Sequence, residues 1–269
     1  MELDKIYNMD CLEGMKMIPD GSVDAVICDL PYGTTDCAWD SVIPMEPLWE
    51  KYRRILKHQG SVLLFGSEPF SSMLRMSNFK WYKYDWIWKK DTPSGYQHAK
   101  NMPMKDYEII SVFSAASMGH ANLLGDRRMT YNPQGTKNCH VIEHNKLHKN
   151  GYITGSRPSH KETIVRDVCN YPRMILEYNN QAGEVSNNVR IHPTQKPVDL
   201  LRYLVLTYTN EGDTVLDNCM GSGTTAIACI KEKRHFIGFE LNKEYYDKAC
   251  KRIKIEQSQL RLSLFDYGI

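Results

Sequence analysis

Short apolar runs alternate with segments of helical spacing at both ends of the chain, and this alternation constrains the fold most. Short apolar runs bounded by turn residues are typical of buried strands, whereas apolar residues three or four positions apart indicate helices. Parallel strands joined by helices account for such an alternation, so we predict an α/β fold with a mostly parallel sheet and helices on both faces. The predicted strands are 5–9, 23–28, 61–65, 84–88, 108–113, 213–217 and 235–239, and the predicted helices are 12–18, 44–58, 197–208, 224–232 and 243–257.

The middle of the chain has a different character. Between residues 115 and 190 the periodicity fades, and Asn, Gly, His, Pro and Lys accumulate. Such a segment is typical of an inserted, loop-rich region and not of a continued sheet. We therefore predict one α/β domain formed by residues 1–114 and 191–269, with residues 115–190 inserted between its halves.

Composition narrows the class of protein without identifying it. The chain has 269 residues, 42% hydrophobic and 25% charged, which suits one globular core with an insertion. No apolar run approaches the roughly 20 residues of a membrane span, and the N-terminus lacks the pattern of a secretion signal. Its eight cysteines form no C-x-x-C pair, which favours free thiols in a reducing cytoplasm. Basic residues concentrate in the middle of the chain, as expected of a face that binds a polyanion or of an ordinary solvated surface.

A glycine-rich turn lies between a predicted strand and a predicted helix, at Asp217-Asn-Cys-Met-Gly-Ser-Gly-Thr-Thr. Gly221 and Gly223 allow a sharp turn and a close approach to a ligand, although tight structural turns use glycines as well. Glu240 follows Gly221 by 19 residues, at the end of the next predicted strand, where a carboxylate can accept both hydroxyls of a ribose. Ala226 stands where a dinucleotide motif has its third glycine, which favours a cofactor without pyrophosphate, such as S-adenosylmethionine.

A second turn, Asp29-Leu-Pro-Tyr-Gly, directly follows the strand that ends at Cys28. A proline turn with a capping aspartate is one interpretation. A catalytic interpretation is more specific. An exocyclic amino group is a poor nucleophile, because its lone pair is delocalised into the ring. The Asp29 carboxylate and the Leu30 carbonyl could accept its two N–H bonds and free the lone pair, while Tyr32 stacks on a base taken out of the duplex. In-line methyl transfer would then depend on positioning and electrostatics.

Three motifs together resemble the beta class of adenine-N6/cytosine-N4 DNA methyltransferases. Asp29-Leu30-Pro31-Tyr32 resembles the D-P-P-Y catalytic motif, and Asp217 to Thr225 resembles the D-P-F-x-G-S-G-T-T cofactor motif. His192-Pro-Thr-Gln-Lys-Pro197 precedes the glycine motif, as it does in that family. The catalytic motif comes before the cofactor motif, which is the circularly permuted order of the beta class. The resemblance spans nearly the whole chain.

This resemblance implies a Rossmann-like methyltransferase fold with a seven-stranded sheet, S-adenosylmethionine as cofactor and double-stranded DNA as partner. It implies that residues 115–190 recognise the target sequence. The methylated atom would be N6 of a flipped-out adenine, since Asp at position 29 favours adenine over cytosine in this family. The implied catalytic residues are Asp29, Leu30, Pro31 and Tyr32, and the implied cofactor-binding residues are Asp10, Phe65, His192, Thr194, Lys196, Asp217, Gly221, Gly223, Thr224, Thr225 and Glu240.

Departures from the family pattern and other activities leave several points open. Leu30 replaces a proline whose backbone carbonyl it can match, whereas Cys219 replaces a phenylalanine and leaves the packing around the cofactor undetermined. Cytosine N4, RNA or a protein amide are alternative substrates, and a protein that binds nucleotides or DNA without catalysis is the alternative from another class. A cluster at Cys139, His140, His144 and His148 suggests zinc, but with no second cysteine nearby we predict no metal. The sequence does not decide between a monomer and a homodimer, nor whether a separate restriction endonuclease accompanies the protein.

Overall fold

The computed structural model describes residues 1–33, 41–144, 163–179 and 195–266. These residues form two compact units, and the first contains Met1–Asn132 and Met174–Ile269. The second unit is Pro133–Arg173. It is shorter than the predicted insertion of residues 115–190, because the segment around Ala116 and Met129 is buried in the core of the first unit. No helix among the described residues is both long and apolar enough to cross a membrane.

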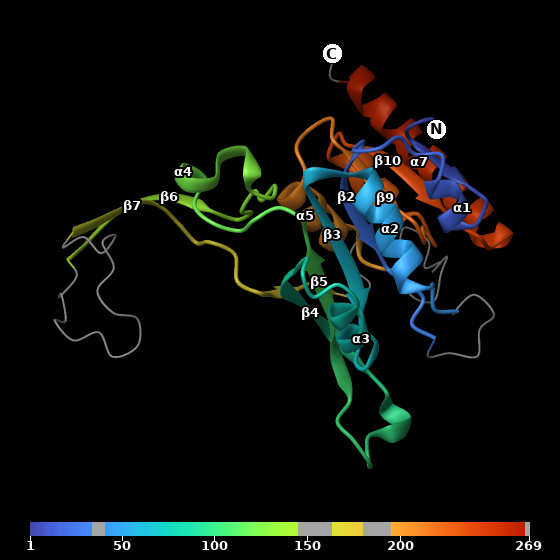
Figure 1. Cartoon of the computed structure of the whole chain (residues 1–269), viewed down its shortest axis with the longest axis horizontal. Coiled ribbons are helices and arrows are strands. Elements are labelled where there is room, and N and C mark those ends of the chain that lie inside the picture. The colour runs from blue at the N-terminus through green and yellow to red at the C-terminus, as the bar shows by residue number, and fades with distance from the viewer. Residues whose placement is uncertain (34–40, 145–162, 180–194, 267–269) are drawn as a thin grey trace. The chain divides into compact units, whose positions relative to one another are not determined.

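A mixed sheet forms the centre of the first unit (Figure 1). Five neighbouring strands, β1, β10, β9, β2 and β3, run parallel to one another. Strand β5 runs antiparallel to both of its neighbours, β3 and β4. The described strands of this sheet, in spatial order, are β1 (Lys5–Tyr7), β10 (His235–Phe239), β9 (Thr214–Asp217), β2 (Val23–Cys28), β3 (Leu56–Gly66), β5 (Lys105–Phe113), β4 (Tyr82–Ser94) and β8 (Ile175–Glu177).

The sheet has one strand more than the seven predicted. Strand β8 pairs parallel with β4 at the edge and comes from the segment expected to be part of the insertion. With three residues, of which only Leu176 is buried, β8 gives no alternating or apolar signal long enough to detect. The mostly parallel α/β class is confirmed, and the strand count of seven is corrected to eight among the described residues.

Helices cover both faces of the sheet, as predicted. On one face α5 (Val198–Tyr208), α6 (Thr224–Lys231) and α7 (Lys243–Asp266) pack against side chains such as Ala25 and Ile27 of β2. On the other face α1 (Cys11–Met15), α2 (Met45–Ile55) and α3 (Phe70–Ser77) pack against Val26 and Cys28 of the same strand. The alternation of β2 side chains between two cores is the period-two pattern of a strand buried on both faces.

Two boundaries differ from the prediction. Helix α2 ends at Ile55 and β3 begins at Leu56, whereas the sequence predicted a helix to residue 58 that Gly60 terminates. Pairing of β3 with β2 overrides the helical spacing of these residues. Helix α3 was not predicted, because Ser67-Glu-Pro-Phe-Ser-Ser has loop composition and only Phe70 and Leu74 carry the apolar face.

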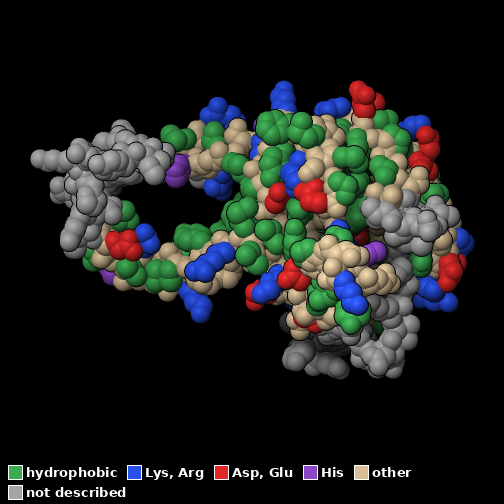
Figure 2. Space-filling view, turned by 90° about the horizontal axis from the view of Figure 1, so that it is seen from below, with side chains coloured by type: hydrophobic (Ala, Val, Ile, Leu, Met, Phe, Trp, Pro, Cys, Tyr) green, Lys and Arg blue, Asp and Glu red, His purple; other side chains and the backbone are tan. Residues whose placement is uncertain are grey.

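The second unit contains a two-stranded antiparallel ribbon of β6 (Lys137–His144) and β7 (Thr163–Cys169). An ion pair between Arg166 and Glu143 at 2.7 Å and a hydrogen bond between His140 Nδ1 and Asp167 at 3.1 Å join the strands. Figure 2 shows basic and apolar side chains exposed on this unit. Among the described residues, no group of three His, Cys, Asp or Glu side chains is placed to hold a metal ion; His148 lies outside them.

Candidate active site

The predicted site residues follow the carboxyl ends of adjacent parallel strands. Asp10 lies three residues after β1, Glu240 directly follows β10, and Asp217 ends β9. Asp29 directly follows β2, and Phe65 is the penultimate residue of β3. Because these strands are neighbours and run in one direction, their ends share one edge of the sheet. The chain leaves β9 and β2 toward opposite sides of the sheet, and this switch point is where open α/β sheets bind ligands.

The glycine turn adopts a conformation that explains its glycines. Gly221 and Gly223 have φ angles of +53° and +80°, in the left-handed region that side chains disfavour. A Cβ on Gly223 would also lie 3.3 Å from the Cβ of Ala249 in α7. The turn therefore depends on glycine both for its backbone conformation and for close packing under α7.

Asp217 stabilises the glycine turn through two hydrogen bonds. Its carboxylate accepts hydrogen bonds from the Cys219 backbone N–H at 3.1 Å and from the Thr225 hydroxyl at 2.6 Å. Burial raises the pKa of Asp217 to about 6, against the effect of these hydrogen bonds. Asn218 is fixed in the same way, because the buried Tyr52 hydroxyl donates to its side-chain oxygen at 2.6 Å. Asp217 thus shapes the turn and presents no carboxylate oxygen free of protein donors.

Glu240 ties the glycine turn to the end of β10. Its two carboxylate oxygens accept the backbone N–H groups of Gly221 and Asn242, each at 2.8 Å. Burial raises the pKa of Glu240, and these hydrogen bonds oppose the increase. Each oxygen keeps a lone pair for a further donor, so the group can accept the two hydroxyls of a ribose. Asp10 instead caps α1, accepting from the N–H groups of Leu12 and Glu13 at 2.9 and 3.1 Å through one oxygen.

The Asp29 carboxylate is held from two sides. The Tyr32 hydroxyl donates to one oxygen at 2.6 Å, and the Lys196 ammonium forms a very short ion pair with the other. Tyr32 also lies against Phe70 of α3, with ring centroids 4.9 Å apart. Leu30 is buried and anchors the turn in the core, while Asp29 and Tyr32 are partly exposed.

Lys196 connects Asp29 to a second carboxylate that the sequence analysis missed. Its ammonium lies 3.3 Å from Glu108 of β5 and 5.1 Å from the centre of the Phe65 ring. The other oxygen of Glu108 accepts from Lys90 of β4 at 2.5 Å. Glu108 was seen only as the first residue of an apolar strand. The sequence does mark Glu108 as a charged residue directly before residues 109–113, which are buried in the sheet.

Electrostatics within this group depend on burial. Burial raises the pKa of Asp29, and the Glu108 carboxylate acts in the same direction against the effect of Lys196. Burial also opposes ionisation of Glu108, but Lys196 and Lys90 outweigh it and hold the pKa of Glu108 below its ordinary value. The two carboxylates raise the pKa of Lys196 to about 12 although burial opposes them. Lys196 therefore stays charged at neutral pH.

The structure thus brings together most of the predicted site residues. Asp29, Tyr32, Phe65 and Lys196 form one group, and Asp217, Gly221 and Glu240 form the neighbouring one. Thr224 and Thr225 are buried in the first turn of α6, directly after the glycine turn. His192 and Thr194 lie outside the described residues, so their predicted contact with the cofactor stays a prediction.

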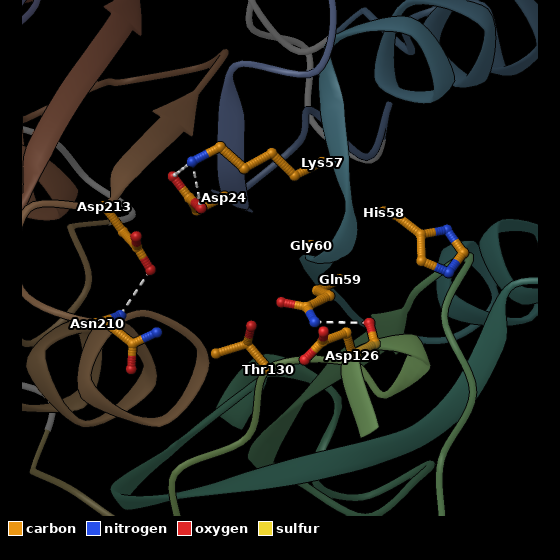
Figure 3. A pocket seen from close by; sticks show the side chains of 9 residues that line it. All are labelled: Asp24, Lys57, His58, Gln59, Gly60, Asp126, Thr130, Asn210 and Asp213. Atoms are coloured by element: carbon orange, nitrogen blue, oxygen red, sulfur yellow. Dashed lines mark hydrogen bonds and ion pairs between the residues drawn. The ribbon is translucent and has the colours of Figure 1, made fainter. Parts of the chain in front are cut away.

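A polar pocket of about 460 Å³ lies at the other end of the strands (Figure 3). Asp24 near the start of β2 accepts from Lys57 near the start of β3 at 2.8 Å, and Asp213 directly precedes β9. These strands run parallel, so the pocket lies at the amino-terminal edge of the sheet, away from Asp29 and the glycine turn. It contains none of the predicted site residues.

Two solved structures share this architecture over most of the chain. The structure of the M1.HpyAVI–SAM complex matches with a TM-score of 0.59 and 24% identity, over 93% of this chain and 98% of that one. PvuII DNA methyltransferase, which is cytosine-N4-specific, matches with a TM-score of 0.64 and 14% identity, over 92% of this chain and 85% of that one. These two likenesses show that the chain has the α/β fold of those structures.

The chain belongs to the N6/N4 DNA methylase family, whose model matches residues 23–251. The chain is also similar in sequence to DNA adenine methyltransferase YhdJ of Escherichia coli (strain K12). The two are 29% identical over 94% of this chain and 84% of the relative. The family resemblance predicted from the three motifs is confirmed.

Proposed function

We propose that the protein transfers a methyl group from S-adenosylmethionine to the exocyclic N6 of a flipped-out adenine in double-stranded DNA. The observation that carries this proposal is the position of the Asp29–Tyr32 turn beside the glycine turn, at the ends of the neighbouring strands β2 and β9. One turn offers acceptors for an amino group, and the other offers a site for a nucleoside cofactor.

The cofactor assignment rests on the groups that the glycine turn and β10 present. Glu240 lies where it can accept ribose hydroxyls, and the turn is anchored to it through the Gly221 N–H at 2.8 Å. M1.HpyAVI, which has the same fold, was solved as a complex with this cofactor. When bound, the cofactor supplies an electrophilic methyl group on a sulfonium.

The chain's own residues would activate the amino group. The Asp29 carboxylate and the Leu30 carbonyl accept its two N–H bonds and favour a lone pair directed at the methyl carbon. The Asp29 charge stabilises the positive charge that develops on the nitrogen during attack. The Tyr32 ring, once its hydroxyl leaves Asp29, stacks on the flipped base. The carboxylate then holds the proton that the methylated nitrogen must lose.

Transfer of labelled methyl groups to unmodified DNA, followed by nucleoside analysis, tests the proposal. Wild type should produce N6-methyladenine, and Asp29→Ala should lose at least about 100-fold in rate while its affinity for the cofactor changes little. Asp20→Ala is the matched control, since this exposed aspartate pairs with Arg54, away from the carboxyl ends of the parallel strands. Cofactor binding without labelling of any DNA would refute the assignment of DNA as substrate.

The same chemistry on cytosine N4 is the second candidate. The observation in its favour is the fold match to the cytosine-N4-specific PvuII enzyme. Asp at position 29 and the relation to an adenine methyltransferase favour adenine. N4-methylcytosine as the labelled product would correct the base and leave the roles of Asp29 and Glu240 unchanged.

We also propose that the middle region reads the DNA sequence. A major groove admits a two-stranded β-ribbon, and the β6–β7 ribbon carries Lys137, His140 and Arg166 among exposed apolar side chains. A cytoplasmic location stays a prediction from the cysteine pattern, and the sequence leaves a homodimer and a companion endonuclease undecided.

A further inference from the structure

Four charged side chains of alternating sign form a row that ends at the catalytic turn. They are Lys90, Glu108, Lys196 and Asp29, and successive members are in contact. The exposed fractions of these side chains are 15%, 16%, 9% and 23% in the same order. The charges of the row sum to zero, which is the condition under which charges are tolerated at such burial.

The Lys196 ammonium is shared by two carboxylates on different strands. It is paired with the Asp29 oxygen that Tyr32 does not occupy, and it lies 3.3 Å from Glu108. Glu108 itself is held in place, because Lys90 occupies its other oxygen at 2.5 Å and its backbone is paired with Trp88 of β4. A small movement of the lysine side chain would therefore exchange one carboxylate for the other.

The resting contact with Asp29 conflicts with methyl transfer. The target amino group must donate to the Asp29 carboxylate, and it becomes positively charged as it attacks the methyl carbon. An ammonium on the same carboxylate competes for its oxygens and repels that developing charge. In the reacting complex the Lys196 ammonium must have another partner that is close, negatively charged and shielded from water.

We propose that Glu108 is a positioning residue that takes over the Lys196 ammonium when the target amino group binds Asp29. This inference rests on the proposed function. The Glu108 oxygen that faces Lys196 is shielded from solvent, so water does not compete for the ammonium there. Binding of the base would shift one hydrogen bond between two carboxylates, and no proton or electron is transferred in this step.

Glu108→Gln is the decisive variant, because glutamine has the same shape but lacks the charge that attracts the ammonium. We expect kcat for DNA methylation to fall at least about tenfold, while the Kd for S-adenosylmethionine stays within about threefold of wild type. Glu177→Gln is the matched control. Glu177 is an exposed carboxylate on β8 that pairs with Lys89 at 3.2 Å, so the same chemical change there should leave kcat unchanged.

A double-mutant cycle with Lys196→Met separates positioning from a structural role. If Glu108 acts through Lys196, adding Glu108→Gln to Lys196→Met should change kcat less than about threefold, with each variant measured at saturating cofactor. A structural role predicts the same loss in both backgrounds. Lys90→Met combined with Glu108→Gln keeps the row neutral and serves as a folded substitute if the single variant is unstable.

The outcomes distinguish this inference from the proposed function. Wild-type kcat in Glu108→Gln, or an equal loss in both backgrounds, would overturn the inference while the wild-type enzyme still methylates DNA. A wild-type protein that methylates no DNA would overturn the proposed function and this inference together.

Discussion

Replacing Glu240 with glutamine should weaken cofactor binding and loosen the glycine turn at the same time. The carboxylate accepts two backbone N–H groups at 2.8 Å, from Gly221 and from Asn242. Glutamine keeps one acceptor oxygen and puts an NH₂ group in place of the other. Either Gly221 or Asn242 therefore loses its partner, and the ribose loses one acceptor and the negative charge.

The magnitude follows from the kind of hydrogen bond that is lost. A bond to a charged group contributes about 1.5–3 kcal/mol, which corresponds to a roughly 10- to 100-fold weaker Kd for the cofactor. The effect on the free energy of unfolding should be smaller, about 1 kcal/mol, since water can reach a half-buried N–H group. Because Gly221 belongs to the turn, we expect the cofactor to restore part of the lost stability at saturating concentration.

Isothermal titration calorimetry with S-adenosylmethionine measures the affinity, and thermal unfolding with and without cofactor measures the stability. Glu244→Gln is the control, because Glu244 is an exposed carboxylate at the start of α7 that pairs with Lys248. A Kd for Glu240→Gln within about threefold of wild type would refute the assignment of Glu240 to the ribose.

Three further predictions concern the stability of the first unit. Gly223→Ala should lose about 1–2 kcal/mol of stability and bind cofactor more weakly, because φ is +80° and the new Cβ meets Ala249. Gly21→Ala, at φ +56° with open space around it, should lose stability only, as thermal unfolding and calorimetry can show. Tyr208→Phe should cost about 1–3 kcal/mol in urea unfolding, because the buried Trp86 indole N–H loses the hydroxyl it contacts at 2.6 Å; unchanged stability would contradict this. Burial raises the pKa of Asp217 to about 6, above its unfolded value, so its contribution to stability is full below about pH 4 and is lost as the pH rises through 6. The stability of wild type relative to Asp217→Asn should thus fall by up to about 3 kcal/mol between pH 4 and pH 7, and a flat difference would argue against a buried, protonated Asp217.

Much of the fold was predictable because it depends on local patterns. The apolar run of β2 and the glycine turn after β9 each give a signal within a few residues, and both lie where expected. Strand β8 and helix α3 were missed, since their formation depends on partners distant in the sequence. The boundary at Leu56 was misplaced because pairing with β2 outweighs a helical pattern that continues past Ile55.

The site was predictable in part for the same reason. Motifs locate Asp29 and Glu240, but no motif shows which carboxylate a lysine will contact in three dimensions. Lys196 was expected to contact the cofactor, and the structure pairs it with Asp29 and with Glu108, which lies 88 positions before it in the sequence. Such a contact becomes visible only when β5 is placed beside β3.

The strand order also constrains when the strands can pair while the chain is being synthesised. Strand β1 is synthesised before the other described strands, yet its described partner in the sheet is β10, which begins at His235. One side of β2 likewise waits for β9, which begins at Thr214. Strands β1 and β2 must remain without these partners until β10 and β9 have emerged, since long-range pairing cannot precede the partner strand. A nascent chain that stops before β9 would carry Asp29 and Tyr32 but no glycine turn, so the two turns can come together only after residue 225 has been synthesised.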